Sequence, residues 1–154
     1  MTPLLKKLNF KNQKQIFVCN APDDIVHLFK SFPEKDFMTF NTAQKEIEFA
    51  IVFVLTQQEI NEYAQQIIPQ LKDDAVFWMC YPKSSSKKYV CDFNRDKGWD
   101  VLGKYNVEGV RQVAIDENWS ALRFRKVQYI SKLTRKFDTL SEQGKIKSGQ
   151  TKSI

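Results

Sequence analysis

Continuous runs of apolar residues are the clearest feature of this sequence. Residues 15–19, 48–55 and 75–81 are mostly hydrophobic and do not alternate with polar residues. Such runs are typical of strands covered on both faces, as in a parallel sheet. A shorter apolar run at residues 37–40 predicts an edge strand. We therefore expect a mostly parallel sheet with helices on both of its faces.

Helical patterns separate these strands. Apolar residues recur at helical spacing over residues 25–32, which predicts a helix between the first strand and the edge strand. Thr56 and Glu59 have the spacing of a capping box, in which each side chain accepts a hydrogen bond from a free amide at the helix start. A second helix is expected to follow, kinked or shortened by Pro69. A third helix is expected from about residue 92 to residue 105.

The last two strands are predicted to form a hairpin. Residues 110–116 and 119–125 both have strand-like composition, and only Glu117 and Asn118 separate them. So short a link permits an antiparallel pair and forbids a parallel crossover. The element order therefore predicts an α/β sheet that ends in an antiparallel hairpin.

Four segments resemble a known family. They are Leu5-Lys6-Lys7-Leu8, Asn20-Ala21-Pro22, Tyr81-Pro82-Lys83 and, most specifically, Gln112-Val113-Ala114-Ile115-Asp116-Glu117-Asn118-Trp119-Ser120-Ala121-Leu122-Arg123-Phe124. Over roughly residues 1–126 the chain resembles an uncharacterised bacterial family, defined only as a domain of unknown function. That family has no established activity, so the resemblance implies a fold and its boundaries but no mechanism.

The predicted element order is also similar to the core of the class I methyltransferases. This similarity implies a three-layer Rossmann-like sandwich, in which the strand at 119–127 inserts between those at 75–81 and 110–116. Methyltransferases hold S-adenosylmethionine with a glycine-rich turn after the first strand and an acid after the second. Here the turn is Asn20-Ala21-Pro22-Asp23, and Asn41 stands in place of the acid. We therefore predict no cofactor, and no useful binding of S-adenosylmethionine.

Charge divides the chain into two parts. The chain has 154 residues and a net charge of +6, but residues 123–154 hold nine Lys or Arg against two acids, so the rest is nearly neutral. We expect one α/β domain over residues 1–127 and a basic C-terminal extension over residues 128–154. Apolar spacing predicts a helix at about 128–143, followed by a disordered tail.

Composition excludes several chemistries. The five glycines all follow residue 97, which excludes an early glycine-rich phosphate loop. A single histidine, His27, excludes multi-histidine zinc sites, and the three cysteines form no CxxC pair, so no metal site is expected. The sequence shows neither a signal peptide nor an apolar run long enough to span a bilayer. These features predict a reduced, cytoplasmic protein without membrane contact.

Candidate ligand-binding residues lie where the predicted strands end, because ligands of open α/β sheets bind there. They are Asn20, Asp23, Thr56, Lys83, Ser84, Ser85, Asp116 and Trp119. Lys83 and its serines can hold an anion, but such a stretch is also typical of a mobile surface loop. Asp116 and Trp119 can form a ligand site that pairs a carboxylate with an aromatic platform. The favoured alternative is a hairpin turn at Asp116 followed by a buried indole at Trp119. No catalytic residue is assigned.

Three functions remain open. The favoured one is a non-catalytic domain that binds a protein or a small anionic ligand at the carboxyl ends of the strands. The second is an enzyme of methyltransferase-like fold with an altered cofactor pocket. The third is a protein that contacts nucleic acid weakly through residues 123–147.

Overall fold

A computed structural model describes residues 1–42, 44–94 and 97–130. Its α-helices are α1 (Pro3–Lys7), α2 (Asp23–Lys30) and α3 (Gln57–Ile67), and its 3₁₀ segments are η1 (Pro33–Phe37), η2 (Ile68–Gln70), η3 (Asp100–Tyr105) and η4 (Val127–Tyr129). Its strands are β1 (Ile16–Cys19), β2 (Met38–Phe40), β3 (Ile47–Phe53), β4 (Leu71–Pro82), β5 (Val107–Ala114) and β6 (Trp119–Lys126).

The strands form one six-stranded sheet in the order β2-β1-β3-β4-β6-β5. Strands β2, β1, β3 and β4 pair in parallel, whereas β6 runs antiparallel to both of its neighbours, β4 and β5. The predicted mostly parallel sheet with a terminal hairpin is confirmed. The predicted insertion of the last strand between its two neighbours is confirmed as well.

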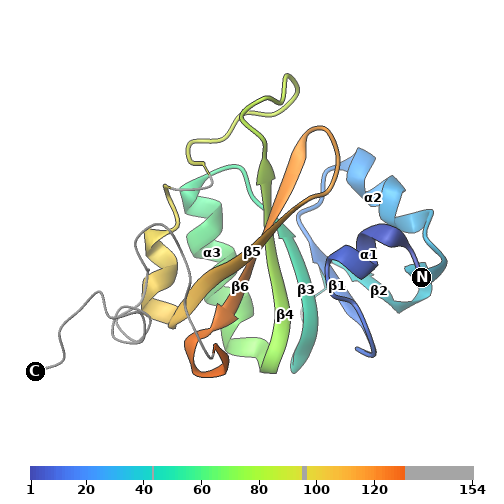
Figure 1. Cartoon of the computed structure of the whole chain (residues 1–154), viewed down its shortest axis with the longest axis horizontal. Helices are drawn as coiled ribbons and strands as arrows, with labels where there is room; N and C mark the ends of the chain where they lie inside the picture. Colours follow the sequence, from blue (N-terminus) through green and yellow to red (C-terminus); the bar gives the residue numbers. More distant parts are fainter. Residues whose placement is uncertain (43, 95–96, 131–154) are drawn as a thin grey trace, which may run out of the picture.

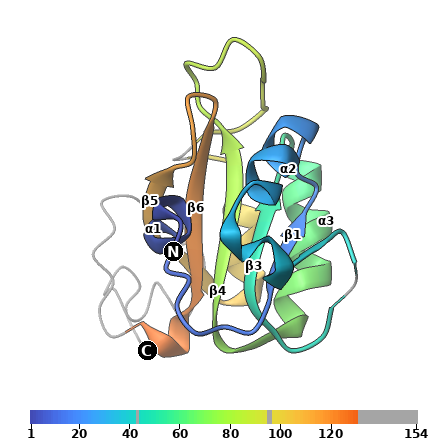
Figure 2. The same cartoon turned by 90° about the vertical axis from the view of Figure 1, so that its right-hand side faces the viewer.

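Helices cover both faces of this sheet, which makes the fold a three-layer Rossmann-like sandwich (Figures 1 and 2). On one face, Ile51 and Trp78 pack in the core formed with α1 and α2. On the other face, Val52 and Phe77 pack in the core formed with α3 and η3. Because neighbouring residues of β3 and β4 enter opposite cores, these strands need apolar residues throughout, and their sequences do not alternate.

Helix α1 was not anticipated from the sequence. It packs on the sheet through Leu5, which is fully buried, as is Leu8 immediately after the helix. The indole nitrogen of Trp78 in β4 donates a hydrogen bond to the Leu8 carbonyl at 2.8 Å. This bond links the N-terminal segment to the central strand and satisfies a buried donor.

The predicted capping box begins α3, with one difference in its partners. Thr56 Oγ1 accepts a hydrogen bond from the Glu59 amide at 3.0 Å. The Glu59 carboxylate accepts from the Leu55 amide at 2.7 Å, one residue before the amide expected for this motif. Pro69 lies in η2, and the α-helix ends before it, at Ile67, as expected.

The helix expected at residues 92–105 is wrong for most of its length. The described part of this segment is a loop up to the short 3₁₀ segment η3. Asp92 caps α3, because its carboxylate accepts from the Gln57 amide at 2.9 Å. Gly98 has a φ of 104°, and a Cβ there would lie 2.3 Å from the Cβ of Phe93. This left-handed backbone conformation ends any helix that starts upstream.

The C-terminal prediction is only partly covered by the described residues. Segment η4 ends at Tyr129, and Ile130, the first apolar residue of the expected helix, is 4% exposed. The rest of the helix predicted at 128–143, and the tail after it, lie outside the described residues. The division between a domain at 1–127 and an extension at 128–154 therefore stays a prediction.

The Thr56 cap gives a direct test of this local structure. Thr56→Ala removes the side-chain acceptor of the Glu59 amide, so we expect the free energy of unfolding to fall by about 1 kcal/mol. Thr56→Ser keeps an acceptor and should retain most of the stability. Urea denaturation measures both variants, and equal stability of Thr56→Ala and the unmodified protein would contradict the cap.

Candidate functional site

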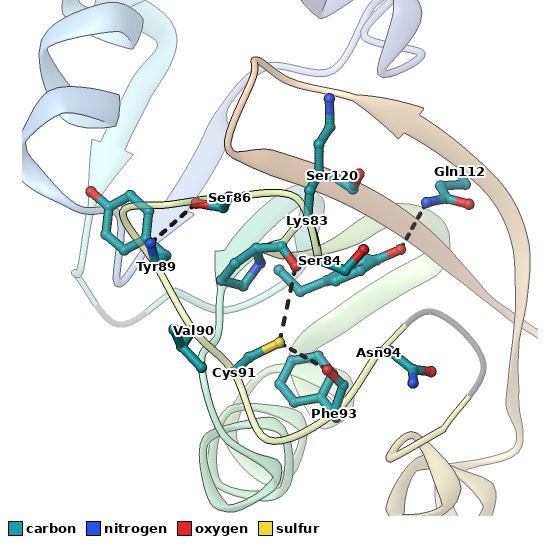
Figure 3. A pocket seen from close by; sticks show the side chains of 12 residues that line it. Lys83, Ser84, Ser86, Tyr89, Val90, Cys91, Phe93, Asn94, Gln112 and Ser120 are labelled. Atoms are coloured by element: carbon teal, nitrogen blue, oxygen red, sulfur yellow. Dashed lines mark hydrogen bonds between the residues drawn. The ribbon is translucent and has the colours of Figure 1, made fainter.

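A pocket of about 570 Å³ lies at the carboxyl end of β4. Residues 81–94, which run from the end of β4 into the loop after it, supply most of its lining, and Gln112 of β5 and Ser120 of β6 complete it. Figure 3 shows Ser84 between the loop and the two strands, whereas the Lys83 side chain extends away from Ser84 and Cys91. Ligand sites in open α/β sheets lie at this end of the strands.

The first half of the loop is fixed to the β5–β6 hairpin. The Lys83 amide donates to the Asn118 carbonyl at 2.8 Å. The Ser86 hydroxyl donates to the Asn118 side chain at 2.8 Å and accepts from the amides of Lys88 and Tyr89. These local hydrogen bonds give a polar, glycine-free loop a defined path.

The second half of the loop is tied to both helical layers. Asp24 at the start of α2 accepts hydrogen bonds from the Tyr89 hydroxyl and the Lys88 ammonium, each at 3.0 Å. The hydrogen bond from Lys88 is the main reason why the pKa of Asp24 lies below its ordinary value. The Asp92 amide donates to the Leu55 carbonyl on the side of α3. The loop therefore holds its side chains in place over the sheet.

Ser120 is the most informative residue of the pocket. It is only 5% exposed, and its hydroxyl has no hydrogen-bond partner among the residues that the structure describes. The buried side-chain atoms that lack a partner in the described part of the chain belong to Thr39, Asn61, Trp119 and Arg123, so the Ser120 hydroxyl is open to the pocket. A hydroxyl that is open to the pocket and makes no bond to another described residue is available to contact a ligand.

The charge of the pocket favours an anion. Lys83 is half-buried, and its ammonium forms no ion pair within the described part of the chain. Ser84 places a second hydroxyl between the walls of the pocket. No aspartate or glutamate is found among the described lining residues. One cation and two hydroxyls without a competing carboxylate match the donors that bind oxyanions.

An aromatic cluster lies beneath the pocket. Tyr81 and Phe93 both contact Trp99, with ring centroids 5.6 Å and 5.0 Å away. Gln112 donates from its side-chain nitrogen to the Tyr81 hydroxyl at 2.8 Å, which leaves its carbonyl oxygen as an acceptor. Gln112 therefore presents its carbonyl oxygen and its second N–H on this side of the pocket, without a net charge.

Lys83 and Ser84 are the two predicted site residues that line this pocket. Ser85 faces a separate depression with Lys87 and Glu117. Asp116 closes the hairpin turn, since one carboxylate oxygen accepts from the amides of Asn118 and Trp119, both at 2.8 Å. The Trp119 ring is buried between Phe53 and Tyr89. The turn and buried indole that the sequence favoured are therefore present.

The other predicted residues lie at the ends of β1 and β3, away from the pocket. Asn20 donates from its side chain to the Phe53 carbonyl and to Glu59, both at 2.8 Å. Thr56 caps α3. Asp23 is exposed in the first turn of α2, where a negative charge stabilises the helix dipole. The structure does not bring these three side chains together with Lys83 and Ser84.

Sequence reasoning missed Cys91, Gln112 and Ser120. One signal for Ser120 was present, because it occupies the same face of β6 as Leu122 and Phe124. A polar residue at such an inward position calls for a partner or a function. Nothing in the sequence pattern of the loop indicated that Cys91 faces the same pocket.

The polar groups at the end of β1 form hydrogen bonds within the protein. The Asn20 amide, which a cofactor would need as a donor, donates to the Asn41 side chain at 2.7 Å. The Asn20 side chain crosses from β1 to the end of β3. Pro22 removes a further amide donor from the turn. The absence of useful S-adenosylmethionine binding stays a prediction that these contacts support.

Comparison with known proteins finds no matching family model and no matching curated protein. The resemblance to an uncharacterised bacterial family therefore stays a prediction. Among solved structures, the chain is similar to a protein of the NADB-Rossmann superfamily from Streptococcus agalactiae, with a TM-score of 0.45 and 10% identity, over 82% of this chain and 68% of that chain. It is similar to LepI in complex with SAM, with a TM-score of 0.46 and 12% identity, over 81% of this chain and 47% of that one.

A further similar structure, from Sulfolobus solfataricus, is assigned to the type 11 methyltransferases. Its TM-score is 0.43 and its identity 11%, over 87% of this chain and 81% of that chain. Likenesses at this level of identity assign neither a ligand nor an activity.

Two further findings concern the described residues only. No three of their histidine, cysteine or acidic side chains are grouped closely enough to hold a metal ion. None of their helices has the length and apolar character needed to cross a bilayer.

The cysteines provide a test of the pocket's accessibility. Burial raises the pKa of the Cys19 thiol to about 11 and that of Cys80 well above its ordinary value, so neither forms the reactive thiolate readily. Cys91 is partly exposed and lines the pocket. We expect iodoacetamide to label Cys91 in the native protein, as located by peptide mass mapping. All three cysteines should react in urea, and native labelling at Cys19 or Cys80 would contradict this arrangement.

Proposed function

We propose that this protein is a binding domain that takes a small anionic ligand in the pocket at the carboxyl end of β4. The Ser120 hydroxyl carries this proposal, because it is open to the pocket and makes no hydrogen bond to another described residue. In the proposed complex, Ser120 and Ser84 donate hydrogen bonds to the anion, and the Lys83 ammonium balances its charge.

Binding is favoured over acid–base catalysis by the residues present. The described lining residues include no histidine and no carboxylate that could serve as a general base. His27 is exposed on α2, and it does not line this pocket. Asp24 touches the loop from outside, where its carboxylate is already used by Lys88 and Tyr89.

A small ligand is favoured over a protein partner by the form of the site. A pocket of about 570 Å³ is in the size range of small-molecule sites, about 300–1,000 Å³. The loop that builds one wall has anchors on the hairpin and on both helical layers, so the pocket is formed before any ligand arrives. The third function, nucleic-acid contact through residues 123–147, concerns residues mostly outside those described and stays a prediction.

Inorganic phosphate, titrated by isothermal calorimetry, tests the proposed site. Lys83→Ala removes the only basic side chain among the described lining residues, and Ser84→Ala removes one hydroxyl. We expect Lys83→Ala to weaken phosphate binding roughly tenfold or more, because a charge-assisted hydrogen bond contributes about 1.5–3 kcal/mol. Ser84→Ala should weaken binding by a smaller factor.

The same loop offers matched controls. Lys87→Ala and Ser85→Ala make the same chemical changes at residues that face a different depression. Both variants should bind phosphate like the unmodified protein. Equal weakening by Lys87→Ala and Lys83→Ala would show that general surface charge attracts the anion. Absence of binding to the unmodified protein at millimolar phosphate would contradict the proposed function.

A further inference from the structure

The pocket is much larger than a simple oxyanion, and this difference bears on the class of ligand. Its volume of about 570 Å³ is in the range of sites that enclose whole organic molecules. A phosphate or carboxylate held by Ser120, Ser84 and Lys83 would fill only part of it. The remainder has its own lining, which differs in chemistry from the anion-binding part.

The two sides of the pocket differ in polarity. Tyr89 and Val90 of the loop give one side apolar surface, and Phe93 adds a ring from the aromatic cluster beneath the pocket. In the view of Figure 3, Tyr89 and Val90 lie on one side of the pocket, whereas Gln112 and Asn94 lie on the other, with Ser84 between them. Pockets that combine an apolar wall with a few polar groups take ligands that are themselves amphipathic.

Val90 is the strongest indication of an apolar ligand group. It is 86% exposed, the highest value among the large exposed hydrophobic residues. Its neighbours Tyr89 and Cys91 are held by hydrogen bonds to Asp24 and to the Phe93 carbonyl, so Val90 is fixed at the rim of the pocket. Single exposed apolar side chains are common, but this one borders a site that already offers an anion-binding group.

The position of the anion within the pocket follows from the polar side chains. Gln112 is neutral, and one of its two N–H groups is already used on the Tyr81 hydroxyl. Lys83 carries the only positive charge among the described lining residues, and Ser120 offers a hydroxyl donor. The anionic group therefore belongs at Ser120 and Lys83, and the rest of the ligand extends toward residues 89–93.

We infer that the ligand of this pocket is an amphipathic organic anion: an oxyanion group joined to an apolar group of about the size of a phenyl ring. This inference rests on the proposed function and narrows it to a ligand class. The oxyanion contacts Ser120, Ser84 and Lys83, while the apolar group packs on Val90 and the neighbouring rings. Burial of the apolar group on these side chains adds affinity that inorganic phosphate cannot gain.

The test compares phenyl phosphate with inorganic phosphate by calorimetry on the full chain. We expect phenyl phosphate to bind at least tenfold more tightly. Val90→Ser should reduce the affinity for phenyl phosphate several-fold and leave that for inorganic phosphate unchanged. Because Val90 is 86% exposed, this substitution does not disturb the core. Phenyl phosphate should also slow the alkylation of Cys91 more than inorganic phosphate does at equal saturation.

Val110→Ser is the matched control. Val110 is also an exposed valine, at 38%, but it lies on β5 and does not line the pocket, so its variant should bind both compounds normally. Equal affinities for the two compounds would overturn the amphipathic ligand and leave the proposed function standing. An equal effect of Val110→Ser and Val90→Ser would also overturn the inference. Failure of both compounds to bind would instead overturn the proposed function.

Discussion

The antiparallel insertion of β6 between β4 and β5 is the constraint on which both the core and the pocket depend. Antiparallel pairing places the start of β6 beside the end of β4, with Trp119 opposite Pro82 and Ser120 opposite Tyr81. Trp119 enters the core on the α1 and α2 face, whereas Ser120 faces the other side of the sheet. If β6 ran parallel to β4, the carboxyl ends of both strands would lie at the same edge of the sheet. The β5–β6 hairpin turn would then not lie beside the loop that follows β4.

The central sheet could be predicted because burial on two faces leaves a strong mark on sequence. Residues 47–53 and 76–82 are buried almost without interruption, and a continuous apolar run records this directly. The segment around residues 92–105 could not be predicted in the same way. Asp92 caps a helix distant in sequence, and Gly98 adopts a positive φ against Phe93. Both effects depend on tertiary contacts that a local pattern does not contain.

The site was predictable only in its coarse position. Lys83 and Ser84, which line the pocket, were predicted because they follow a buried strand, and ligands bind at such ends. The same rule selected Asn20 and Thr56, whose side chains form hydrogen bonds within the protein. Strand ends need polar side chains both for capping and for ligands, and spacing alone does not separate the two uses. The contribution of Ser120 emerges only when the neighbours of its hydroxyl are known.

The unpaired hydroxyl of Ser120 is best tested by comparing Ser120→Ala with Ser86→Ala in urea denaturation and phosphate titration. Ser86 uses its hydroxyl to hold the loop, so its loss should lower the free energy of unfolding by about 1 kcal/mol. Ser120→Ala should leave the free energy of unfolding unchanged or raise it, since no bond within the protein is lost, and should weaken phosphate binding. A loss of about 1 kcal/mol in Ser120→Ala, with phosphate affinity unchanged, would mean that this hydroxyl serves the fold and not a ligand.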